Sequence, residues 1–315
     1  MVDYPRTAVA MRDWFPTEDA CRAYLIRLRW PDGITCAACG ATEVWEKKPP
    51  LYRCAHCHHD FSVTSGTLFS ATHKPLRIWF EAIWHATDQK AGVSALGLQR
   101  VVGLGSDRTA WNWLHKLRKA MVRPGRERLS GVVEVDEAFI GGPRSGKRGR
   151  GAAGKPLVMI AAQVDGGKIG RIRMVRIPHA SATNLFSAIK RTLEPATRIQ
   201  TDQWKGYSGL TKLGYGHEVI HPTTELGKHL LPRINLTASR LKRWLLGTHQ
   251  GAVRPQHLDS YRDEFTFRFN RRTSKSRGLL FYRLLQQAVA LDPVKGKDLV
   301  GGRPVKKYET TTYGS

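Results

Sequence analysis

Acidic residues are scarce in this chain. There are 26 Asp and Glu against 51 Lys and Arg, which gives the 315 residues a formal net charge of +25. The basic residues extend from Arg6 to Lys307 and are interleaved with 9 Trp and 9 Tyr, so the charge is not that of one disordered tail on a neutral body. An excess of this size favours a polyanionic partner, and nucleic acid is the one that the composition indicates.

Long apolar segments are also missing. No stretch approaches the roughly 18 consecutive apolar residues of a membrane-spanning helix. The first residues, 1–5, lack the pattern of a signal peptide. A membrane surface is the second choice of partner for any basic protein, but the sequence favours a soluble, cytoplasmic protein with no membrane partner.

Cysteines number only five, and four of them form two Cys-x-x-Cys pairs with 14 residues between the pairs. Thiolates at this spacing are typical of a zinc ribbon, in which structural zinc replaces the core that so small a module lacks. Two nested disulfides are a poor alternative in a reducing cytosol. Tyr52 and Phe61 are expected to pack around the site, and Cys21 to be a buried helix residue. The predicted zinc ligands are Cys36, Cys39, Cys54 and Cys57.

A helical segment follows the predicted ribbon. An apolar helix is expected from Pro75, and a second helix over 94–101. A Gly-Leu-Gly turn at 103–105 then leads to a third helix capped at 106 or 107, which is the layout of a helix-turn-helix. The alternative is an ordinary helical hairpin with solvated polar faces. The side chains predicted to contact DNA are Arg108, Thr109, Asn112 and Lys116.

From Gly131 the apolar period changes from helical to strand-like. Three strands, a helix and a strand predict a mixed α/β sheet, with a short strand and three helices beyond it. The expected strands are 132–140, 156–164, 170–177, 197–201 and 218–220, and the expected helices are 181–193, 235–246, 255–270 and 278–291.

Two aspartates lie on or directly after these strands. Asp136 stands inside an apolar run, and Asp202 closes the run 197–202. An ionised carboxylate beside buried strands is costly unless it is compensated, and a divalent metal is the usual compensation when two lie in one sheet. The alternative is two separate, solvated strand ends. Glu134 and Glu137 flank Asp136 and are expected on the opposite face of the strand, as supporting or surface groups.

The stretch 141–150 between the first two strands is rich in Gly and Arg, and it is expected to be a mobile basic loop. Its Lys147 and Arg148 are expected to contact the DNA backbone. The continuation of the loop nearly matches a phosphate-binding P-loop. That interpretation is rejected, because Pro156 stands in place of the Ser or Thr that would hold Mg²⁺ and a strand follows where a helix should begin.

Four motifs resemble those of a known family. They are Val135-Asp136-Glu137-x-x-Ile140-Gly141-Gly142, Thr201-Asp202-x-x-x-Gly206-Tyr207, Leu241-Lys242-Arg243-Trp244-Leu245-Leu246-Gly247-Thr248-His249 and Asp263-Glu264-Phe265-x-Phe267-Arg268-Phe269-Asn270-Arg271-Arg272. Together they resemble the DDE-type transposases of bacterial insertion sequences, in particular the ISXO2-like group with an N-terminal zinc ribbon. The resemblance extends over residues 15–290.

The resemblance implies a ribonuclease H-like catalytic sheet, whose first strand carries the first catalytic Asp and whose fourth carries the second. Asp136 and Asp202 fall on these positions. The third metal ligand of the family lies on a later helix, seven residues before a Lys, and is a Glu in most groups. Counting back from Lys242 gives Asn235, and some related transposases are similar in carrying Asn there. Glu225 is the alternative carboxylate upstream.

The resemblance also implies a division of the chain into four parts. An N-terminal helix and zinc ribbon are expected over 1–72, and a helix-turn-helix DNA-binding domain over 73–128. A ribonuclease H-like transposase catalytic domain is expected over 129–292. The last part, 293–315, is a basic C-terminal tail.

The predicted function is that of a transposase, an enzyme that binds the ends of its insertion sequence, cleaves DNA phosphodiester bonds and joins 3′ ends to target DNA. The expected mechanism uses two metal ions, Mg²⁺ or Mn²⁺ in its place, held by Asp136, Asp202 and Asn235. Lys242 is expected at the scissile or a flanking phosphate, or simply on the DNA backbone, and Arg243 is expected to bind DNA. The chain is expected to form a homo-oligomer in the DNA complex. The alternatives are a non-catalytic zinc-ribbon and helix-turn-helix regulator, or a degenerate, domesticated transposase.

Overall fold

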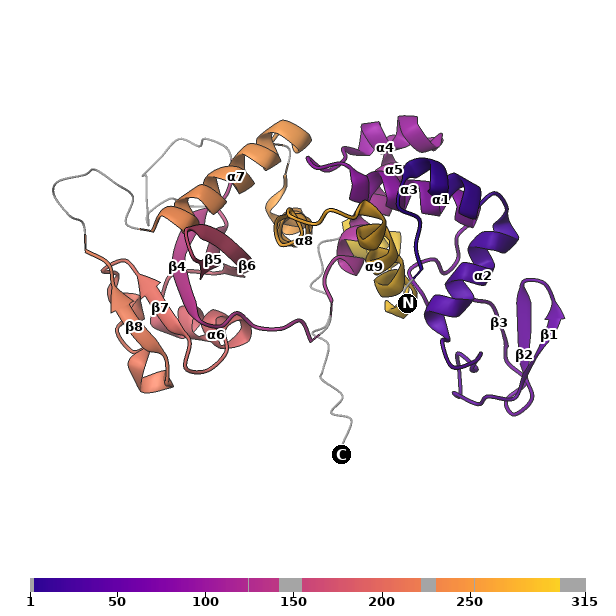
Figure 1. Ribbon diagram of the computed structural model, residues 1–315, viewed down its shortest axis with the longest axis horizontal. Coiled ribbons are helices and arrows are strands. Elements are labelled where there is room, and N and C mark those ends of the chain that lie inside the picture. The colour runs from indigo at the N-terminus through magenta and orange to yellow at the C-terminus, as the bar shows by residue number, and fades with distance from the viewer. Residues whose placement is uncertain (1–2, 124, 142–154, 222–230, 252, 301–315) are drawn as a thin grey trace. The chain divides into compact units, whose positions relative to one another are not determined.

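The structure, a computed structural model, describes residues 3–123, 125–141, 155–221, 231–251 and 253–300 (Figure 1). The chain forms two compact units. The first combines residues 1–86, 95–120 and 278–315, and the second combines 87–94 with 121–277. This division differs from the expected domains, because the helix expected to close the catalytic domain packs with the N-terminal residues instead.

A small antiparallel sheet forms the N-terminal module. Trp30, at the end of the helix that precedes the sheet, meets Tyr52 and Phe61 edge-on, with ring centroids 6.5 and 6.0 Å apart. These aromatic rings pack with two of the cysteines in one small cluster, as expected for a module whose core is otherwise minimal. The elements are α2 (Glu18–Arg29) and the three neighbouring strands β1 (Val44–Lys48), β2 (Leu51–Cys54) and β3 (Asp60–Phe61).

Helices make up the rest of the first unit. The Glu18 carboxylate at the start of α2 accepts hydrogen bonds from the backbone nitrogens of Leu76 and Arg77, at 2.8 and 2.9 Å, and so caps a second helix 58 residues later. Phe80 lies edge-on to Phe281, with centroids 5.7 Å apart. The helices are α1 (Ala8–Trp14), α3 (Leu76–Asp88), α4 (Ala95–Val102), α5 (Asp107–Ala120), α9 (Arg277–Ala290) and α10 (Gly296–Val300). Of these, α1 and α10 are not anticipated from the sequence.

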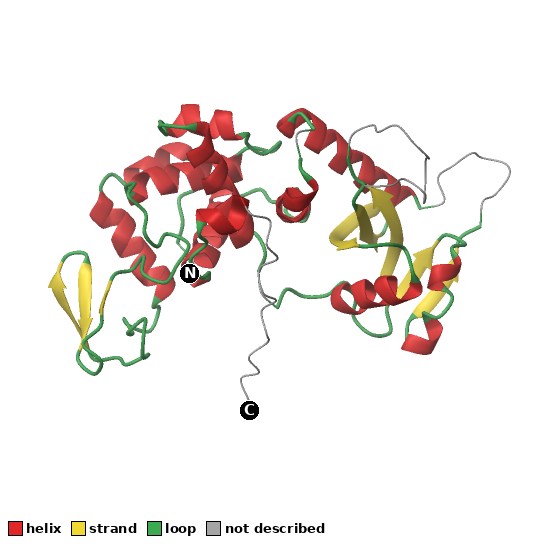
Figure 2. Ribbon diagram, turned by 180° about the vertical axis from the view of Figure 1, so that it is seen from behind, coloured by secondary structure: helices red, strands yellow, loops and turns green. Residues whose placement is uncertain are grey.

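A five-stranded mixed sheet forms the centre of the second unit (Figure 2). Its order is β6-β5-β4-β7-β8; β4, β5 and β6 pair antiparallel, while β7 pairs parallel to both β4 and β8. The predicted mixed α/β sheet is therefore confirmed, with boundaries within a few residues of those expected. The strands are β4 (Val132–Phe139), β5 (Leu157–Asp165), β6 (Lys168–Ile177), β7 (Arg198–Thr201) and β8 (Gly216–Val219).

Each face of this sheet carries its own core. The face that includes Val133 and Val135 is covered by α6 (Ala182–Thr192). The opposite face is covered by α7 (Pro232–His249) and α8 (Leu258–Phe269). Because side chains alternate along a strand, the even-numbered residues of β4 face α7 and the odd-numbered ones face α6.

This alternation corrects one expectation. Glu134 is two residues from Asp136 and therefore lies on the same face of β4, not on the opposite one; only Glu137 points to the other face. The expectation is wrong for Glu134, because residues two apart on a strand share one face.

The end of α8 closes the outer edge of the sheet. The Asn270 amide donates to the carbonyl oxygen of Ile172 over 3.0 Å and accepts from its backbone nitrogen over 2.7 Å, so it pairs with edge strand β6 as another strand would. Arg272 adds a hydrogen bond to the Gly170 carbonyl at 3.2 Å. The last of the four motifs thus contributes to architecture. In the part of the chain that the structure describes, no helix is both long and apolar enough to cross a membrane.

Candidate functional site

Four sulfur atoms converge in the N-terminal module. The Sγ atoms of Cys36 and Cys57 are 3.6 Å apart, as are those of Cys39 and Cys54, and all four lie within 4.8 Å of one another. Tetrahedral zinc with Zn–S bonds of about 2.3 Å requires sulfurs roughly 3.8 Å apart. The observed arrangement therefore fits zinc. The predicted ligand set is brought together by the structure.

Backbone groups favour the ionised form of one of these thiols. Burial by itself raises the pKa of Cys36, but hydrogen bonds from the backbone nitrogens of Cys39 and Ala38 and from Cys57 lower it to about 6. A turn that directs N–H groups at sulfur stabilises thiolate, the form that binds zinc. The fifth cysteine, Cys21, is fully buried in α2, as expected, and burial raises its pKa to about 12.

In the second unit, the strand register aligns the two aspartates. Val132, Val133 and Glu134 of β4 pair with Arg198, Ile199 and Gln200 of the parallel strand β7. Extending this register by two residues places Asp136 directly beside Asp202, which follows β7. Both residues thus lie toward the carboxyl ends of neighbouring parallel strands, and Asp136 is on the face that α7 covers. Adjacent strands are about 4.8 Å apart, which is within reach of one shared cation.

Local hydrogen bonds orient both carboxylates. The Asp136 Oδ1 atom accepts from the backbone nitrogen of Glu137 at 2.7 Å, and Asp202 Oδ1 accepts from that of Trp204 at 3.0 Å. Bonds of this kind restrict each side chain without neutralising it. The pair keeps the oxygen donors that a hard cation such as Mg²⁺ prefers.

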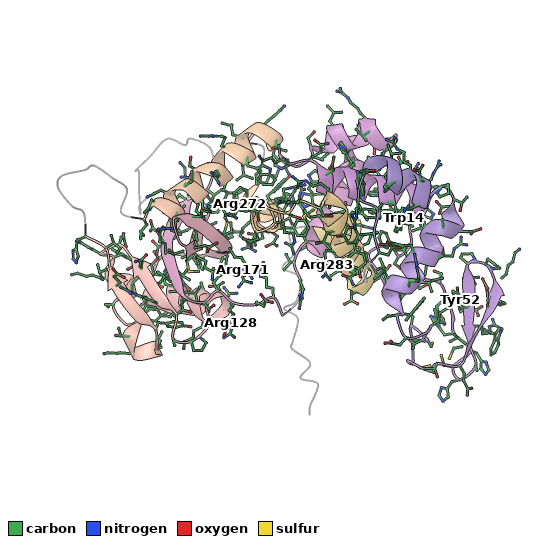
Figure 3. The ribbon with its side chains drawn as sticks, viewed as in Figure 1. Trp14, Tyr52, Arg128, Arg171, Arg272 and Arg283 are labelled. Atoms are coloured by element: carbon green, nitrogen blue, oxygen red, sulfur yellow. The ribbon has the colours of Figure 1, made fainter. Side chains whose placement is uncertain are left out.

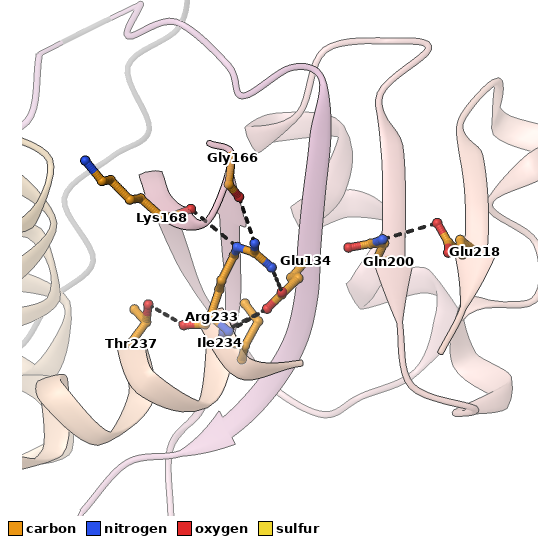
Figure 4. Close-up of polar contacts among 8 residues, drawn as sticks. All are labelled: Glu134, Gly166, Lys168, Gln200, Glu218, Arg233, Ile234 and Thr237. Atoms are coloured by element: carbon orange, nitrogen blue, oxygen red, sulfur yellow. Dashed lines mark hydrogen bonds and ion pairs between the residues drawn. The ribbon is translucent and has the colours of Figure 1, made fainter. Parts of the chain in front are cut away.

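A third carboxylate of the same face connects β4 to α7 (Figure 4). Glu134, only 2% exposed, accepts hydrogen bonds from the backbone nitrogens of Arg233 and Ile234, at 2.9 and 3.1 Å. Its other oxygen pairs with the Arg233 guanidinium at 2.8 Å. The same guanidinium donates to the carbonyl oxygens of Gly166 and Lys168 in the turn between β5 and β6. Glu134 therefore caps α7 and fixes its first turn against the strand of Asp136.

The predicted third ligand lies on that first turn. Asn235 directly follows Ile234, whose backbone nitrogen bonds to Glu134, and it is exposed. Lys242 is also exposed and is seven residues further along the helix; at 100° per residue this places it on nearly the same side of α7, about 10 Å along the axis. Arg243 is exposed too. The buried stripe of the helix, from Ile234 to Leu245, packs on the sheet.

On the opposite face, Glu137 connects β4 to the turn after Asp202. The Tyr207 hydroxyl donates to Glu137 Oε1 over 2.5 Å, and burial followed by the charge of Glu137 raises the pKa of Tyr207 well above its ordinary value. A Cβ on Gly206 would lie 2.5 Å from the Trp204 Nε1 atom, so only glycine fits there. The indole Nε1 of Trp204 donates to the Ala180 carbonyl at 2.9 Å, and the ring packs on the core of the sheet.

Two helices of the first unit occupy the expected helix-turn-helix positions. The Ser106 Oγ atom accepts from the backbone nitrogen of Thr109 at 3.2 Å, so Ser106, one of the two predicted caps, caps α5. Arg108 is exposed and Thr109 is half-buried. Asn112 and Lys116 are also half-buried, and helix α10 packs against α5. Burial lowers the pKa of Lys116. The start of α5 is thus more open than its middle.

Three of the predicted site residues, Lys147, Arg148 and Glu225, lie outside the described residues. Within the described part of the chain, the zinc-type cluster is the one place where ligand atoms of three or more His, Cys, Asp or Glu side chains converge. The aspartate pair therefore lacks a third such side chain there. An amide oxygen, which Asn235 carries, is the type of donor that would complete a set of hard oxygen ligands.

Sequence reasoning did not find the supporting roles of Glu134, Arg233 and Tyr207. Tyr207 stands in a quoted motif, but nothing in the motif names Glu137 as its partner. Glu134 could have been placed on the face of Asp136 by counting, since strand neighbours at even spacing share a face. Its partner Arg233 is 99 residues away and no local pattern points to it.

The comparisons with known proteins identify two regions of the chain. Residues 128–270 match the ISXO2-like transposase domain, and residues 16–60 match the transposase zinc-ribbon domain. The chain is also 24% identical over 275 residues to the "Uncharacterized protein in transposable element ISH50" of Halobacterium salinarum, an alignment that covers 81% of this chain and 91% of that protein. The protein class is that of the transposases. Within it, this chain belongs to the ISXO2-like family of insertion-sequence transposases with an N-terminal zinc ribbon.

Proposed function

We propose that this chain is an active transposase, which binds the ends of its insertion sequence, cleaves DNA phosphodiester bonds there and joins the 3′ ends to target DNA. The observation that carries the proposal is the parallel register of β4 and β7, whose continuation by two residues brings Asp136 beside Asp202. Two unrelated strand ends would not require carboxylates at the same level. We further propose that the sheet, in which Asp136 lies on the first strand and Asp202 follows the fourth, is ribonuclease H-like.

Asp136, Asp202 and Asn235 would hold divalent metal, Mg²⁺ or Mn²⁺. When bound, such ions activate the attacking water or 3′-hydroxyl and stabilise the oxygen that leaves. The protein's own part is to keep the oxygen donors in place before DNA arrives. Glu134 does so by fixing the helix of Asn235, and Glu137 does so by fixing the turn after Asp202. Lys242 presents a positive charge to a phosphate on the same side of the helix as Asn235.

End recognition is assigned to the first unit. The exposed start of α5 offers Arg108 and Thr109 to base edges or phosphates, and the adjacent turn is short enough for helix-turn-helix docking. Asn112 and Lys116 contribute less in this arrangement, because they are partly covered. The net charge of +25 provides the sequence-independent attraction to DNA.

The test is metal-dependent nicking of a duplex that carries the element end. Asp136→Ala and Asp202→Ala should each abolish nicking in Mg²⁺ while end binding stays near that of the wild type, because the carboxylates act in the chemical step. Asp165→Ala is the matched control: Asp165 is an exposed aspartate that ends strand β5 of the same sheet, and since β5 is antiparallel to β4 it lies at the other edge.

Nicking by Asp136→Ala, or equal loss in the Asp165→Ala control, would refute the assigned site. If the wild-type protein binds its element ends but does not nick them in Mg²⁺ or Mn²⁺, the chain is a DNA-binding relative without catalysis.

A further inference from the structure

An arginine-rich pocket lies in the second unit, away from the aspartate pair. It is a cavity of about 280 Å³ at the edge of the sheet, where strand β6 meets the end of α8 and the segment before β4. Arg171, which Figure 3 labels, lies on this edge strand. The lining residues are Met121, Arg123, Arg126, Glu127, Arg171, Arg173, Thr266, Phe267, Asn270 and Arg271.

The lining has a large excess of positive charge. It contains five arginines and one carboxylate, so its formal charge is 5 − 1 = +4. The carboxylate, Glu127, forms an ion pair with Arg171 at 2.5 Å. Arg173 is only 6% exposed, and burial, followed by the like charges of Arg126 and Arg171, lowers its pKa to about 10. Burial lowers the pKa of Arg126 as well.

The inner guanidinium groups are held in place mainly by neutral groups. Arg173 donates to the carbonyl oxygens of Ile172 and Glu127, at 3.0 and 2.5 Å. Arg271 donates to the Phe267 carbonyl at 3.2 Å, and its guanidinium carbon lies 4.1 Å from the centroid of the Phe267 ring. Carbonyl oxygens and an aromatic face thus orient these groups, while Glu127 and Asp263 are the carboxylates whose charges act on Arg173 and Arg126. Keeping several like charges this close in a concave site is unfavourable unless an anion joins them.

We propose that this pocket binds a phosphate of the DNA backbone. The proposal rests on the proposed function for its ligand, since a DNA-processing protein meets phosphodiesters in long arrays. Arginine is suited to this because its planar group donates paired hydrogen bonds that match phosphate oxygens. Free inorganic phosphate has the same chemistry and is the competing source.

The bound phosphate is not the one that is cut. Strand β6 is separated from β4 by β5, so the pocket lies about 10 Å across the sheet from Asp136. Arg173 pairs with Ala161, a member of the core on the α6 face, whereas Asp136 faces α7. The pocket therefore holds a stretch of backbone that passes the edge of the sheet, at a distance from the cleavage site.

The experiment measures how DNA affinity of the full-length protein depends on salt. Each phosphate contact contributes about 0.9 to the slope of log K against log salt concentration. Arg123→Gln combined with Arg171→Gln should therefore make the slope shallower by about 0.9, at any DNA sequence, because the pocket holds one phosphate. Glu127→Gln should act in the opposite sense and lower the Kd by about two- to fivefold, because it removes an anion that competes for Arg171.

Arg198→Gln and Glu218→Gln are the matched controls, because these residues form an ion pair of 2.8 Å between β7 and β8, outside the pocket. They should leave the slope within about 0.3 of the wild-type value, well below the 0.9 of one contact. The proposal is overturned if the pocket variants match these controls. Calorimetry with inorganic phosphate on the wild type and the pocket variant gives the second outcome. The proposal is also overturned if phosphate binding depends on the pocket while the salt slope for DNA is the same in both proteins. Because binding alone is measured, failure here is distinguishable from a failure of Asp136→Ala to abolish nicking.

Discussion

The Tyr207 hydroxyl and the Glu137 carboxylate form a hydrogen bond of 2.5 Å on one face of β4, one residue from Asp136. On the other face, Glu134 holds the first turn of α7. Two carboxylates that are not themselves proposed as metal ligands therefore connect the strand of Asp136 to the segments that carry Asp202 and Asn235. The positions of the three proposed ligands depend on these two links.

Tyr207→Phe should destabilise the second unit by about 1.5–3 kcal/mol, the usual contribution of a hydrogen bond to a charged group, because the half-buried Glu137 carboxylate would lose the hydrogen bond from the Tyr207 hydroxyl. Urea unfolding followed by tryptophan fluorescence measures this. Tyr215→Phe is the control, since Tyr215 belongs to the same core and its pKa is raised mainly by burial. Equal effects of the two changes would show that the link to Glu137 adds nothing.

The same tyrosine should make stability sensitive to high pH. Burial and the Glu137 charge raise the folded-state pKa of Tyr207 above its unfolded value of about 10, so its contribution is complete below pH 10 and is lost as pH rises. The wild-type protein should therefore lose more stability than Tyr207→Phe between pH 9 and 11. Urea midpoints for both proteins across this range test the prediction, and parallel curves would contradict it.

Glu134→Ala should cost about 3–5 kcal/mol, because it leaves the Arg233 charge and two backbone donors of α7 without their partner. Arg233→Ala alone and the double variant complete a cycle that isolates the pair. Glu218→Ala is the control, because this half-buried carboxylate on β8 pairs with the exposed Arg198 and its loss should cost about 1 kcal/mol or less. If Glu134→Ala resembles this control, α7 is held by its apolar stripe alone.

Cys36→Ser and Cys57→Ser should each abolish stoichiometric zinc and unfold the N-terminal module, whose aromatic cluster has little other support. Metal analysis and the near-ultraviolet spectrum of the aromatic cluster report the two effects. Cys21→Ala is the matched control, because this cysteine is buried in α2 and lies outside the four-sulfur cluster. Full zinc content in the serine variants would refute the assigned ligands.

Asn235→Ala should reduce nicking of element ends by several tenfold steps, whereas Asn235→Asp should keep or raise the rate by adding a charge to the ligand set. Ser239→Ala, one turn further on the exposed side of α7, should have little effect. If Glu225→Ala is inactive while Asn235→Ala keeps full activity, Glu225 is the third ligand.

Local patterns were enough to predict the features that depend on residues close in sequence. Alternating apolar residues placed β4 and the position of Asp136 within it, and two Cys-x-x-Cys pairs placed the zinc-type cluster. The cap of α5 at Ser106 followed from its side chain. In each case the interacting groups are neighbours along the chain or belong to a module of a few dozen residues.

Features that join distant segments were not predicted. Glu134 and Arg233 are 99 residues apart, and the arginines of the edge pocket come from 123 to 271. Helix α9 belongs to the first unit and not to the expected catalytic domain. Its amphipathic pattern would be the same in either unit, so the pattern does not tell which apolar surface the helix covers. Such choices are made by packing between elements, which a single sequence does not record.

The position of α9 has a consequence for the order of events during synthesis. Phe281 packs on Phe15 and Phe80, and the Leu68 backbone nitrogen bonds to the carbonyl of Ala288. A nascent chain that has released its first 120 residues from the ribosome still lacks this helix, so the N-terminal unit must wait for nearly the whole chain before its core is complete. Residues 121–277, which with 87–94 make up the second unit, are all synthesised before α9 is complete. A chain truncated after the sheet and α8 would carry both proposed catalytic aspartates but would lack a complete first unit, to which end recognition is proposed to belong.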